Sequence, residues 1–342
     1  MKQKYQTILF TFWVCLIVAC ANQTANVPSA TKTPQVTNQV AKNQPTVVSS
    51  QLSFELKDTR INVSPQRGNI AWSHSGDRIA FTYHFTLWTV LADNWNKSSQ
   101  VYAGYNEWKV FPQFIAWSPD DKKVGLNLFN MQDDSQEIYK MVEVNVESGV
   151  ASVITTSQTM LTDWSRTNQI ATVRPTLGVL DLSNNNWKEL VEPLPFPDQF
   201  AGSLTPGIPR WTSHGTLVIP QPVTKKDSVG EYAVYERQLE SNQWHRMPVQ
   251  ILTANSLSPI LAPSPDGKWI AWVQREFLGN EDIWKIILYE VSTGKMIEAA
   301  NNQAKNTFNW QALTWSPDAK RIAFSAGPNS SASTIWILEI SE

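Results

Sequence analysis

Short apolar runs alternate with polar turns along most of this chain, and the pattern recurs at a nearly constant spacing. In each recurrence an apolar segment leads to a tryptophan position, a polar turn of four to six residues follows, and a second apolar run begins, as in IAWSPDDKKVGL at 115–126. Successive tryptophan positions lie 45, 47, 47, 52 and 52 residues apart, at Trp72, Trp117, Trp164, Trp211, Pro263 and Trp315. A repeat of this length is typical of stacked supersecondary units that cannot bury their apolar faces alone.

Each unit contains four strand-like runs. In the first unit the second run spans Arg78–Phe85 and the third spans Thr86–Leu91, and a more polar fourth run closes a unit, as at Val150–Thr155. Four short strands of a meander in every 45–52 residues predict one blade of a β-propeller. We therefore expect an all-β fold, a six-bladed β-propeller over residues 51–342 with four antiparallel strands in each blade.

The last unit predicts how the ring closes. Only 27 residues follow Trp315, enough for three strands, whereas the run Phe54–Val63 precedes the first unit and has no blade of its own. Because an unpaired strand edge is unfavourable, we expect this N-terminal strand to complete the sixth blade.

The turn motif resembles a known repeat. WSPD at Trp117–Asp120 and Trp315–Asp318, SPDGK at 264–268, and the IAF or IAW runs that follow such turns are similar to the blade repeat of TolB-type six-bladed propellers. The resemblance covers residues 51–342 and implies the fold. It does not imply the Tol-system role, because TolB carries an α/β domain before its propeller that this sequence does not show. The motif aspartates occupy the same turn of different blades, so we interpret them as turn residues rather than as a cluster of acids.

The N-terminus resembles a bacterial lipoprotein signal. Lys2 and Lys4 precede the apolar run Ile8–Val18, and Ile17-Val18-Ala19-Cys20 matches all four positions of a lipobox. The resemblance implies cleavage before Cys20, whose thiol and amine would then carry acyl chains. An ordinary cleaved signal peptide, with Cys20 incidental, is the alternative. Cys15 is the other cysteine and lies in the segment to be removed, so we expect no disulfide in the mature chain.

We expect three segments: a lipoprotein signal peptide at 1–19, an acylated and disordered tether at 20–50, and the propeller at 51–342. Residues 21–50 contain no aromatic side chain and are rich in Thr, Asn, Gln and Pro, so they cannot bury enough apolar surface to fold alone. Several acyl chains give stable membrane attachment, which predicts a lipid-anchored protein of the cell envelope. Ala21, which follows the cysteine, favours the outer membrane if the host is Gram-negative.

Composition narrows the function classes. The chain has 28 Lys and Arg against 30 Asp and Glu, a formal charge of −2, and no basic stripe, so we do not expect nucleic acid as a partner. Of its four histidines, His74 and His214 fall in the same turn of blades one and four, His84 at the end of a second strand and His245 on an outer strand, so no three can meet. We therefore expect no metal site, no cofactor and no catalytic triad.

The best binding candidates lie outside the repeat, on the connections between blades. These are Trp108, Lys109 and Phe111 in 106–114, Phe196 and Phe200 in 192–209, and Phe308 and Trp310 in 305–311. Aromatic side chains exposed on loops of a rigid scaffold suit a protein interface. The alternative is that these rings fold back and cap the channel.

Two charged residues of the innermost strands are channel candidates. Asp163 and Arg210 directly precede the motif tryptophans of neighbouring blades. They form either an inter-blade ion pair or a charged part of the channel wall that contacts a ligand.

Together these patterns predict a non-enzymatic module that binds or scaffolds a protein or peptide, with a glycan as the second choice of partner. The alternative function is an envelope polysaccharide lyase or hydrolase with its active site in the channel. Three or more acidic or histidine side chains in the channel would favour the enzyme. A structural spacer with no specific ligand is a third hypothesis.

Overall fold

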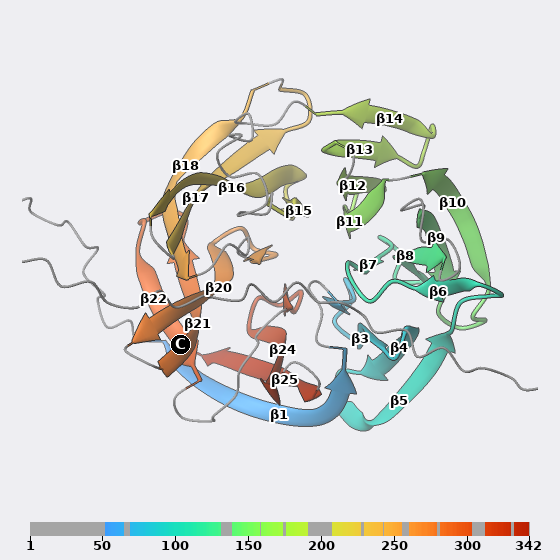
Figure 1. The fold of residues 1–342 in the computed structure, drawn as a ribbon, viewed down its shortest axis with the longest axis horizontal. Helices are drawn as coiled ribbons and strands as arrows, with labels where there is room; N and C mark the ends of the chain where they lie inside the picture. Colours follow the sequence, from blue (N-terminus) through green and yellow to red (C-terminus); the bar gives the residue numbers. More distant parts are fainter. Residues whose placement is uncertain are drawn as a thin grey trace, which may run out of the picture. The chain divides into compact units, whose positions relative to one another are not determined.

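The computed structural model describes residues 52–64, 69–130, 139–157, 159–173, 176–190, 207–226, 229–241, 243–254, 260–278, 281–302, 312–329 and 332–341. These residues form six antiparallel sheets arranged as blades around a common centre, which confirms the expected six-bladed β-propeller (Figure 1). Among them, no helix is long and apolar enough to cross a membrane. The predicted signal peptide and tether lie outside the described residues.

The first three blades follow one another along the chain, each running from its innermost to its outermost strand. Blade 1 consists of β2 (Ile70–Trp72), β3 (Arg78–Tyr83), β4 (Thr86–Leu91) and β5 (Asn94–Tyr102). Blade 2 consists of β6 (Trp108–Val110), β7 (Ala116–Trp117), β8 (Lys123–Asn130), β9 (Tyr139–Asn145) and β10 (Ala151–Ser157). Blade 3 consists of β11 (Met160–Trp164), β12 (Gln169–Val173), β13 (Gly178–Asp181) and β14 (Asn186–Glu189).

The other three blades repeat this order, except that the sixth takes its outermost strand from the start of the propeller. Blade 4 consists of β15 (Arg210–Trp211), β16 (Thr216–Lys226), β17 (Val229–Gln238) and β18 (His245–Ala254). Blade 5 consists of β19 (Leu261–Pro263), β20 (Trp269–Leu278), β21 (Glu281–Glu290) and β22 (Met296–Asn301). Blade 6 consists of β23 (Leu313–Trp315), β24 (Arg321–Asn329), β25 (Ala332–Ser341) and β1 (Ser53–Val63).

The ring closes through β1, as the sequence predicted. β1 pairs antiparallel with β25 from Ser53 opposite Ser341 to Val63 opposite Ser333. Ile61 and Val63 are buried in a cluster that also contains Trp72 of blade 1. The N-terminal strand therefore joins the last blade to the first.

The turn after each innermost strand explains the repeated motif. In blade 2 the Ser118 hydroxyl donates to Asp120 at 2.7 Å and accepts the backbone N–H of Lys123 at 3.0 Å, so the two side chains close the turn locally. Ser264 and Asp266 in blade 5 do the same at 2.6 Å. This confirms that the motif aspartates are turn residues.

The fourth residue after the tryptophan position has a positive φ in every blade. The six residues are Gly76, Asp121, Asn168, Gly215, Gly267 and Ala319. Glycine, asparagine and aspartate tolerate this left-handed conformation better than other residues, whereas alanine does not share that advantage. The requirement explains why the motif so often continues with glycine or a short polar residue.

Blade 2 differs from the prediction in its innermost strand. β6 and β7 both pair with β8, so the inner strand is split into two pieces. The predicted loop 106–114 therefore contains a strand. In blade 1 the predicted run Arg78–Phe85 ends early, because β3 stops at Tyr83 and a two-residue turn follows.

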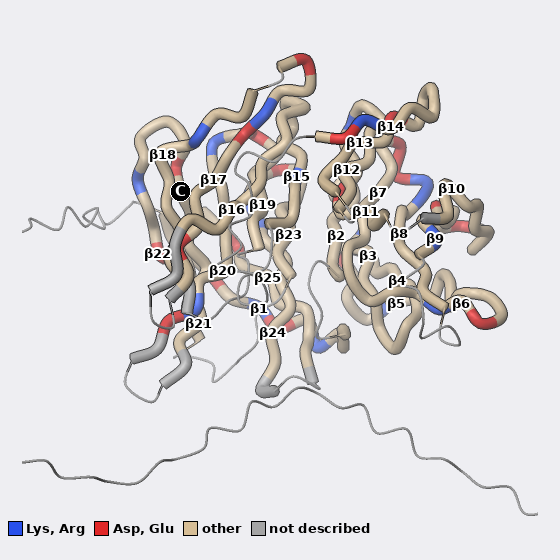
Figure 2. The backbone as a smooth tube through the Cα atoms, turned by 45° about the horizontal axis from the view of Figure 1, so that its top comes forward, with Lys and Arg blue, Asp and Glu red and all other residues tan. Residues whose placement is uncertain are grey.

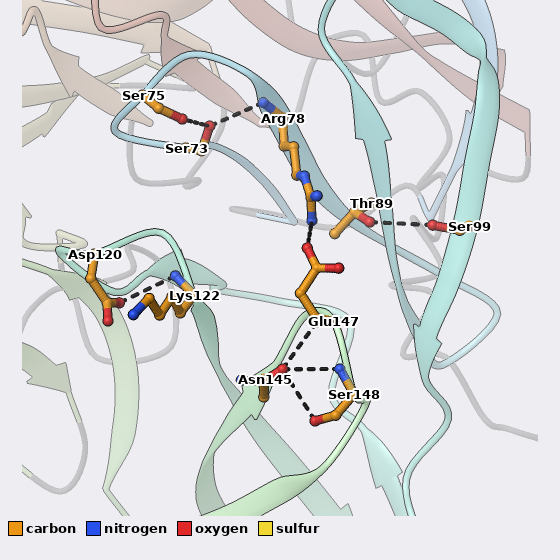
Figure 3. A network of polar contacts seen from close by, with 10 residues as sticks. All are labelled: Ser73, Ser75, Arg78, Thr89, Ser99, Asp120, Lys122, Asn145, Glu147 and Ser148. Atoms are coloured by element: carbon orange, nitrogen blue, oxygen red, sulfur yellow. Dashed lines mark hydrogen bonds and ion pairs between the residues drawn. The ribbon is translucent and has the colours of Figure 1, made fainter.

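Polar side-chain contacts near the strand ends also link neighbouring blades. Figure 3 shows Arg78, at the start of β3, reaching Glu147 in the turn after β9, with 2.7 Å between Nη1 and Oε1. Asn145 holds that turn by accepting the backbone N–H groups of Glu147 and Ser148. Figure 2 shows acidic and basic residues interspersed over the described blades. Exposed pairs of this kind contribute little stability individually.

Candidate functional site

A cavity of about 150 Å³ lies where the innermost strands of all six blades meet. Most blades contribute small side chains to its wall, such as Ala71, Ala116 and Ala262. Blades 3 and 4 instead contribute Asp163 and Arg210. The part of the channel wall that blades 3 and 4 form is therefore charged.

Asp163 and Arg210 each bind the backbone of the other's strand. One carboxylate oxygen of Asp163 accepts the backbone N–H of Trp211 at 2.8 Å and the other accepts that of Trp164 at 2.9 Å. Nη1 of Arg210 donates to the carbonyl oxygen of Thr162 at 2.9 Å. The two side chains thus cross-link β11 and β15, which is an inter-blade link made through the backbone. Their role in contacting a ligand stays a prediction.

Burial affects the protonation of both groups. Burial raises the pKa of Asp163, although the positive charge of Arg210 and the backbone hydrogen bonds oppose it. Burial likewise lowers the pKa of Arg210, opposed by the charge of Asp163. Each charge therefore compensates the desolvation of the other.

His74 extends the polar wall from the turn of blade 1. Its backbone N–H and that of Ser75 donate to the two carboxylate oxygens of Asp121 in blade 2, at 2.7 and 2.6 Å. Burial lowers the pKa of the His74 imidazole, opposed by the nearby Asp121 carboxylate. The ring is therefore neutral near pH 7 and can act as a hydrogen-bond donor or acceptor.

The expected exposure of Trp108 is wrong. Its side chain is only 7 % exposed, because β6 pairs with β8 and turns the indole into the core of blades 1 and 2. The Nζ atom of Lys140 lies 3.9 Å from the ring centroid and donates to the hydroxyl of Tyr105 at 2.8 Å. Lys109, the next residue of β6, is half-buried.

Phe111 is half-buried and belongs to an aromatic cluster that crosses from blade 1 to blade 2. Its ring centroid lies 5.8 Å from that of Phe129 and 5.4 Å from that of Tyr139, and Phe129 lies 5.8 Å from Phe85. Tyr139 is buried, whereas Phe85 is 44 % exposed. We call these four residues the aromatic cluster. It leads from the core to the surface.

Phe85 sits in an unusual turn. Tyr83 pairs with Thr86, and the two residues between them, His84 and Phe85, both have positive φ values of 47° and 60°. This is the geometry of a type I′ hairpin turn, which normally carries Asn-Gly or Asp-Gly. A bulky side chain in this conformation is a strained arrangement.

Phe196, Phe200, Phe308, Trp310 and Cys20 lie outside the described residues. Within the described part of the chain, no group of three or more His, Cys, Asp or Glu side chains could hold a metal ion.

Sequence reasoning missed Phe85 and Arg166. Phe85 was included in a predicted strand, although His84 and Phe85 between two apolar runs were the available sign of a two-residue turn. Arg166 lies in the turn after the blade 3 tryptophan and lines the channel cavity. The sequence places Arg166 in that turn, but the sequence does not show that the turn borders a cavity.

Comparisons with known proteins agree on the fold. No family model and no curated protein matches this sequence. An oligogalacturonate lyase in complex with manganese is similar in structure, with a TM-score of 0.55 and 12 % identity over 80 % of this chain and 77 % of that one. TolB from Acinetobacter baumannii has a TM-score of 0.50 and 15 % identity over 80 % of this chain and 63 % of that one.

A TolB-type protein from Agrobacterium tumefaciens has a TM-score of 0.53 and 12 % identity over 86 % of this chain and all of that one. The chain spans less than two thirds of the Acinetobacter baumannii protein. At such low identity these likenesses establish the propeller fold alone.

Proposed function

We propose that this protein is a non-enzymatic binding module of the cell envelope, anchored by lipid on Cys20, and that it holds a protein or peptide partner on the aromatic cluster of blades 1 and 2. The observation that carries the proposal is the strained and exposed position of Phe85. A glycan is the second choice of partner, because aromatic rings also stack on sugars.

The backbone strain and the exposed ring of Phe85 both support a contact with a partner. A residue other than glycine in the left-handed region costs about 1–2 kcal/mol, and two consecutive residues of the turn are in that region. Phe85 contacts Phe129 but remains 44 % exposed, so part of its ring has no partner among the described residues. Covering the exposed part, about 90 Å² of a phenylalanine, would contribute about 2 kcal/mol.

The gradation of burial within the cluster also supports an interface. Tyr139 anchors it in the core, Phe111 and Phe129 are half-buried, and Phe85 lies at the surface. A rigid aromatic side chain supported by a packed base is typical of an interface hot spot, because little side-chain entropy is lost on binding.

A site-specific photo-cross-linker tests this proposal. Introduced at position 85 in intact cells, it should trap one partner reproducibly, whereas the same group at Leu252, which is 49 % exposed on β18 of blade 4, should not. The purified partner should then bind Phe85→Ala at least tenfold more weakly than the wild type, and Leu252→Ala equally well. If position 85 and position 252 trap the same proteins, or if Phe85→Ala binds like the wild type, the aromatic cluster is not the interface.

The anchor is tested separately. Metabolic labelling with a clickable palmitate analogue should mark the wild-type protein and leave Cys20→Ser unlabelled, and only the wild type should partition into detergent. In a Gram-negative host, membrane separation should then recover the labelled protein with the outer membrane. Labelling of Cys20→Ser would contradict the lipoprotein assignment without affecting the binding proposal.

The alternative is an envelope lyase or hydrolase that uses the channel, and the described channel lining favours binding over it. The lining contains one carboxylate, Asp163, and one imidazole, His74, and both carboxylate oxygens already accept backbone N–H groups. Turnover of a polysaccharide panel by the wild type, lost in Asp163→Asn with the fold retained, would support the enzyme instead.

A further inference from the structure

The outermost strand of blade 2, β10, lies at the periphery of the ring (Figure 1). Within the described residues, β10 has β9 as its only neighbouring strand. Because the backbone groups of an antiparallel strand point alternately to its two sides, β10 directs half of its N–H and C=O groups away from the blade. A further strand can bind these groups, and folded proteins commonly prevent this with charged residues or proline on the edge.

β10 lacks the residues that protect the other outermost strands. Its sequence, ASVITTS, contains no charged residue and no proline, and it is rich in β-branched residues that favour an extended backbone. The outermost strands of the other five blades all contain charged residues, for example Lys97 in β5, Lys188 in β14, Arg246 in β18, Glu298 in β22 and Lys57 in β1. β10 is therefore the outermost strand best suited to pair with another chain.

β10 also carries apolar side chains that the rest of the described chain leaves uncovered. Val153 is 54 % exposed, and Val150, directly before the strand, is 63 % exposed. These are the two largest exposed fractions among the large apolar side chains of the described residues. Exposed apolar side chains on an uncharged edge strand favour association, because a partner strand removes them from water while it binds the free backbone groups.

A groove of about 630 Å³ lies beside β10, between blades 2 and 3. Val153, Ile154 and Leu182 form its apolar part, and the irregular register that follows Val153 brings the first two into the same groove. Its charged lining residues are two cations and two anions, namely Lys123, Arg166, Asp120 and Glu143. These charges balance, and Lys123 is paired with Glu143 at 2.6 Å, so the groove favours an occupant without charge.

We propose that β10 pairs antiparallel with β10 of a second copy of this protein, across a two-fold axis near Val153. Such an axis brings two copies of each interface residue close together, so a charged edge strand would repel itself, whereas β10 brings no charge. Val150 and Val153 of each copy are then covered by the other copy, and an uncharged strand lies against the groove of each. The occupant that the edge and the groove require is thus present in the chain itself.

Cross-linking between two full-length copies tests the pairing in intact cells. The two copies carry different epitope tags, and a photo-cross-linker is introduced at position 153 of one of them. We expect a product that contains both tags and has the mass of two chains. The same group at Trp187, which is 41 % exposed on the outermost strand β14, should not give this product. No such product at position 153, an equal yield at position 187, or a product with another protein only, would overturn the proposal.

A charge on the edge should prevent association. With Val153→Lys in both copies, the amount of one copy that co-purifies with the other in detergent should fall by about tenfold or more, because two ammonium groups would face each other across the axis. Leu252→Lys, at an exposed apolar position of β18 in blade 4, is the matched control and should co-purify like the wild type. Unchanged co-purification of Val153→Lys would contradict pairing through β10.

A charge-swap pair separates loss of pairing from loss of folding. Val153→Lys in one copy and Val153→Glu in the other place opposite charges across the axis, so co-purification should recover most of the wild-type level. A misfolded variant would not recover in this way, and failure of recovery would rule out the two-fold pairing. Phe85→Ala should self-associate normally, because Phe85 lies in the turn between β3 and β4 of blade 1. This result separates the test from that of the aromatic cluster.

Discussion

The indole Nε1 of Trp117 in blade 2 donates a hydrogen bond to the carbonyl oxygen of Ala71 in blade 1 at 3.0 Å. Both residues are buried, and Trp117 packs in the cluster between the two blades. The motif tryptophan of blade 2 therefore links blade 2 to blade 1. Trp315, the motif tryptophan of blade 6, links blade 6 to blade 5 in the same way, through the carbonyl of Ala262.

Trp117→Ala should lower the free energy of unfolding by about 3–5 kcal/mol, because it leaves a cavity between blades and an unpaired carbonyl. Urea denaturation measures the change. Trp187→Ala, which removes an indole that is 41 % exposed on an outer strand, is the control and should cost less than half as much. Similar losses in the two variants would show that Trp117 is not a core contact.

Removal of β1 should destabilise the whole ring. Deletion of 51–64 removes the strand that pairs with β25 and takes Ile61 and Val63 out of the cluster shared with blade 1. We expect a lower thermal midpoint and a loss of cooperativity, because β25 of blade 6 becomes an exposed edge strand and the packing between blades 6 and 1 loses two buried side chains. Deletion of an equally long part of the tether, 21–34, should leave the midpoint unchanged. An unaltered midpoint after deletion of 51–64 would contradict closure through β1.

The stabilisation that Asp120 gives to its turn should disappear at low pH. The hydroxyl of Ser118, which donates to Asp120, lowers the pKa of that carboxyl below its ordinary value of 3.8, with further help from the backbone N–H of Lys122. Because the folded state then binds fewer protons than the unfolded state, this stabilisation is present above about pH 4 and is lost as the pH falls through the folded pKa.

Asp120→Asn should therefore be less stable than the wild type at pH 7, and the difference should shrink at pH 3. Urea denaturation at both pH values measures it. Ser118→Ala removes the donor and should show the same pH dependence. A difference that is equal at the two pH values would mean that the hydrogen bond does not act through the ionised carboxylate.

Ala319→Gly should stabilise the protein. Ala319 has φ of 55° at the position where other blades have glycine, asparagine or aspartate. Relief of the left-handed strain, minus the added freedom of glycine in the unfolded chain, should give about 0.5–1 kcal/mol. Ala323→Gly, in the buried part of β24, is the control and should destabilise. A loss of stability in Ala319→Gly would show that this turn is unstrained.

The local pattern of the sequence was enough to determine the architecture. The spacing from Trp72 to Trp315 predicted six blades, and the run 54–63 predicted the closing strand. Turns such as Trp117–Asp120 predicted where the first two strands of a blade meet. These features depend on short-range chemistry: turn residues bond to their own backbone, and apolar runs must be buried whatever their neighbours are.

Only the tertiary structure decided which side chains are available for binding. Trp108 proved buried because β6 pairs with β8, whereas Phe85 proved exposed because a strained turn holds it outside. The link from Asp163 to the backbone N–H of Trp211 joins strands whose residues are 48 positions apart in the chain. Exposure and pairing of this kind are set by contacts between blades. A repeated local pattern contains no information about them, since the same motif occupies a different environment in each blade.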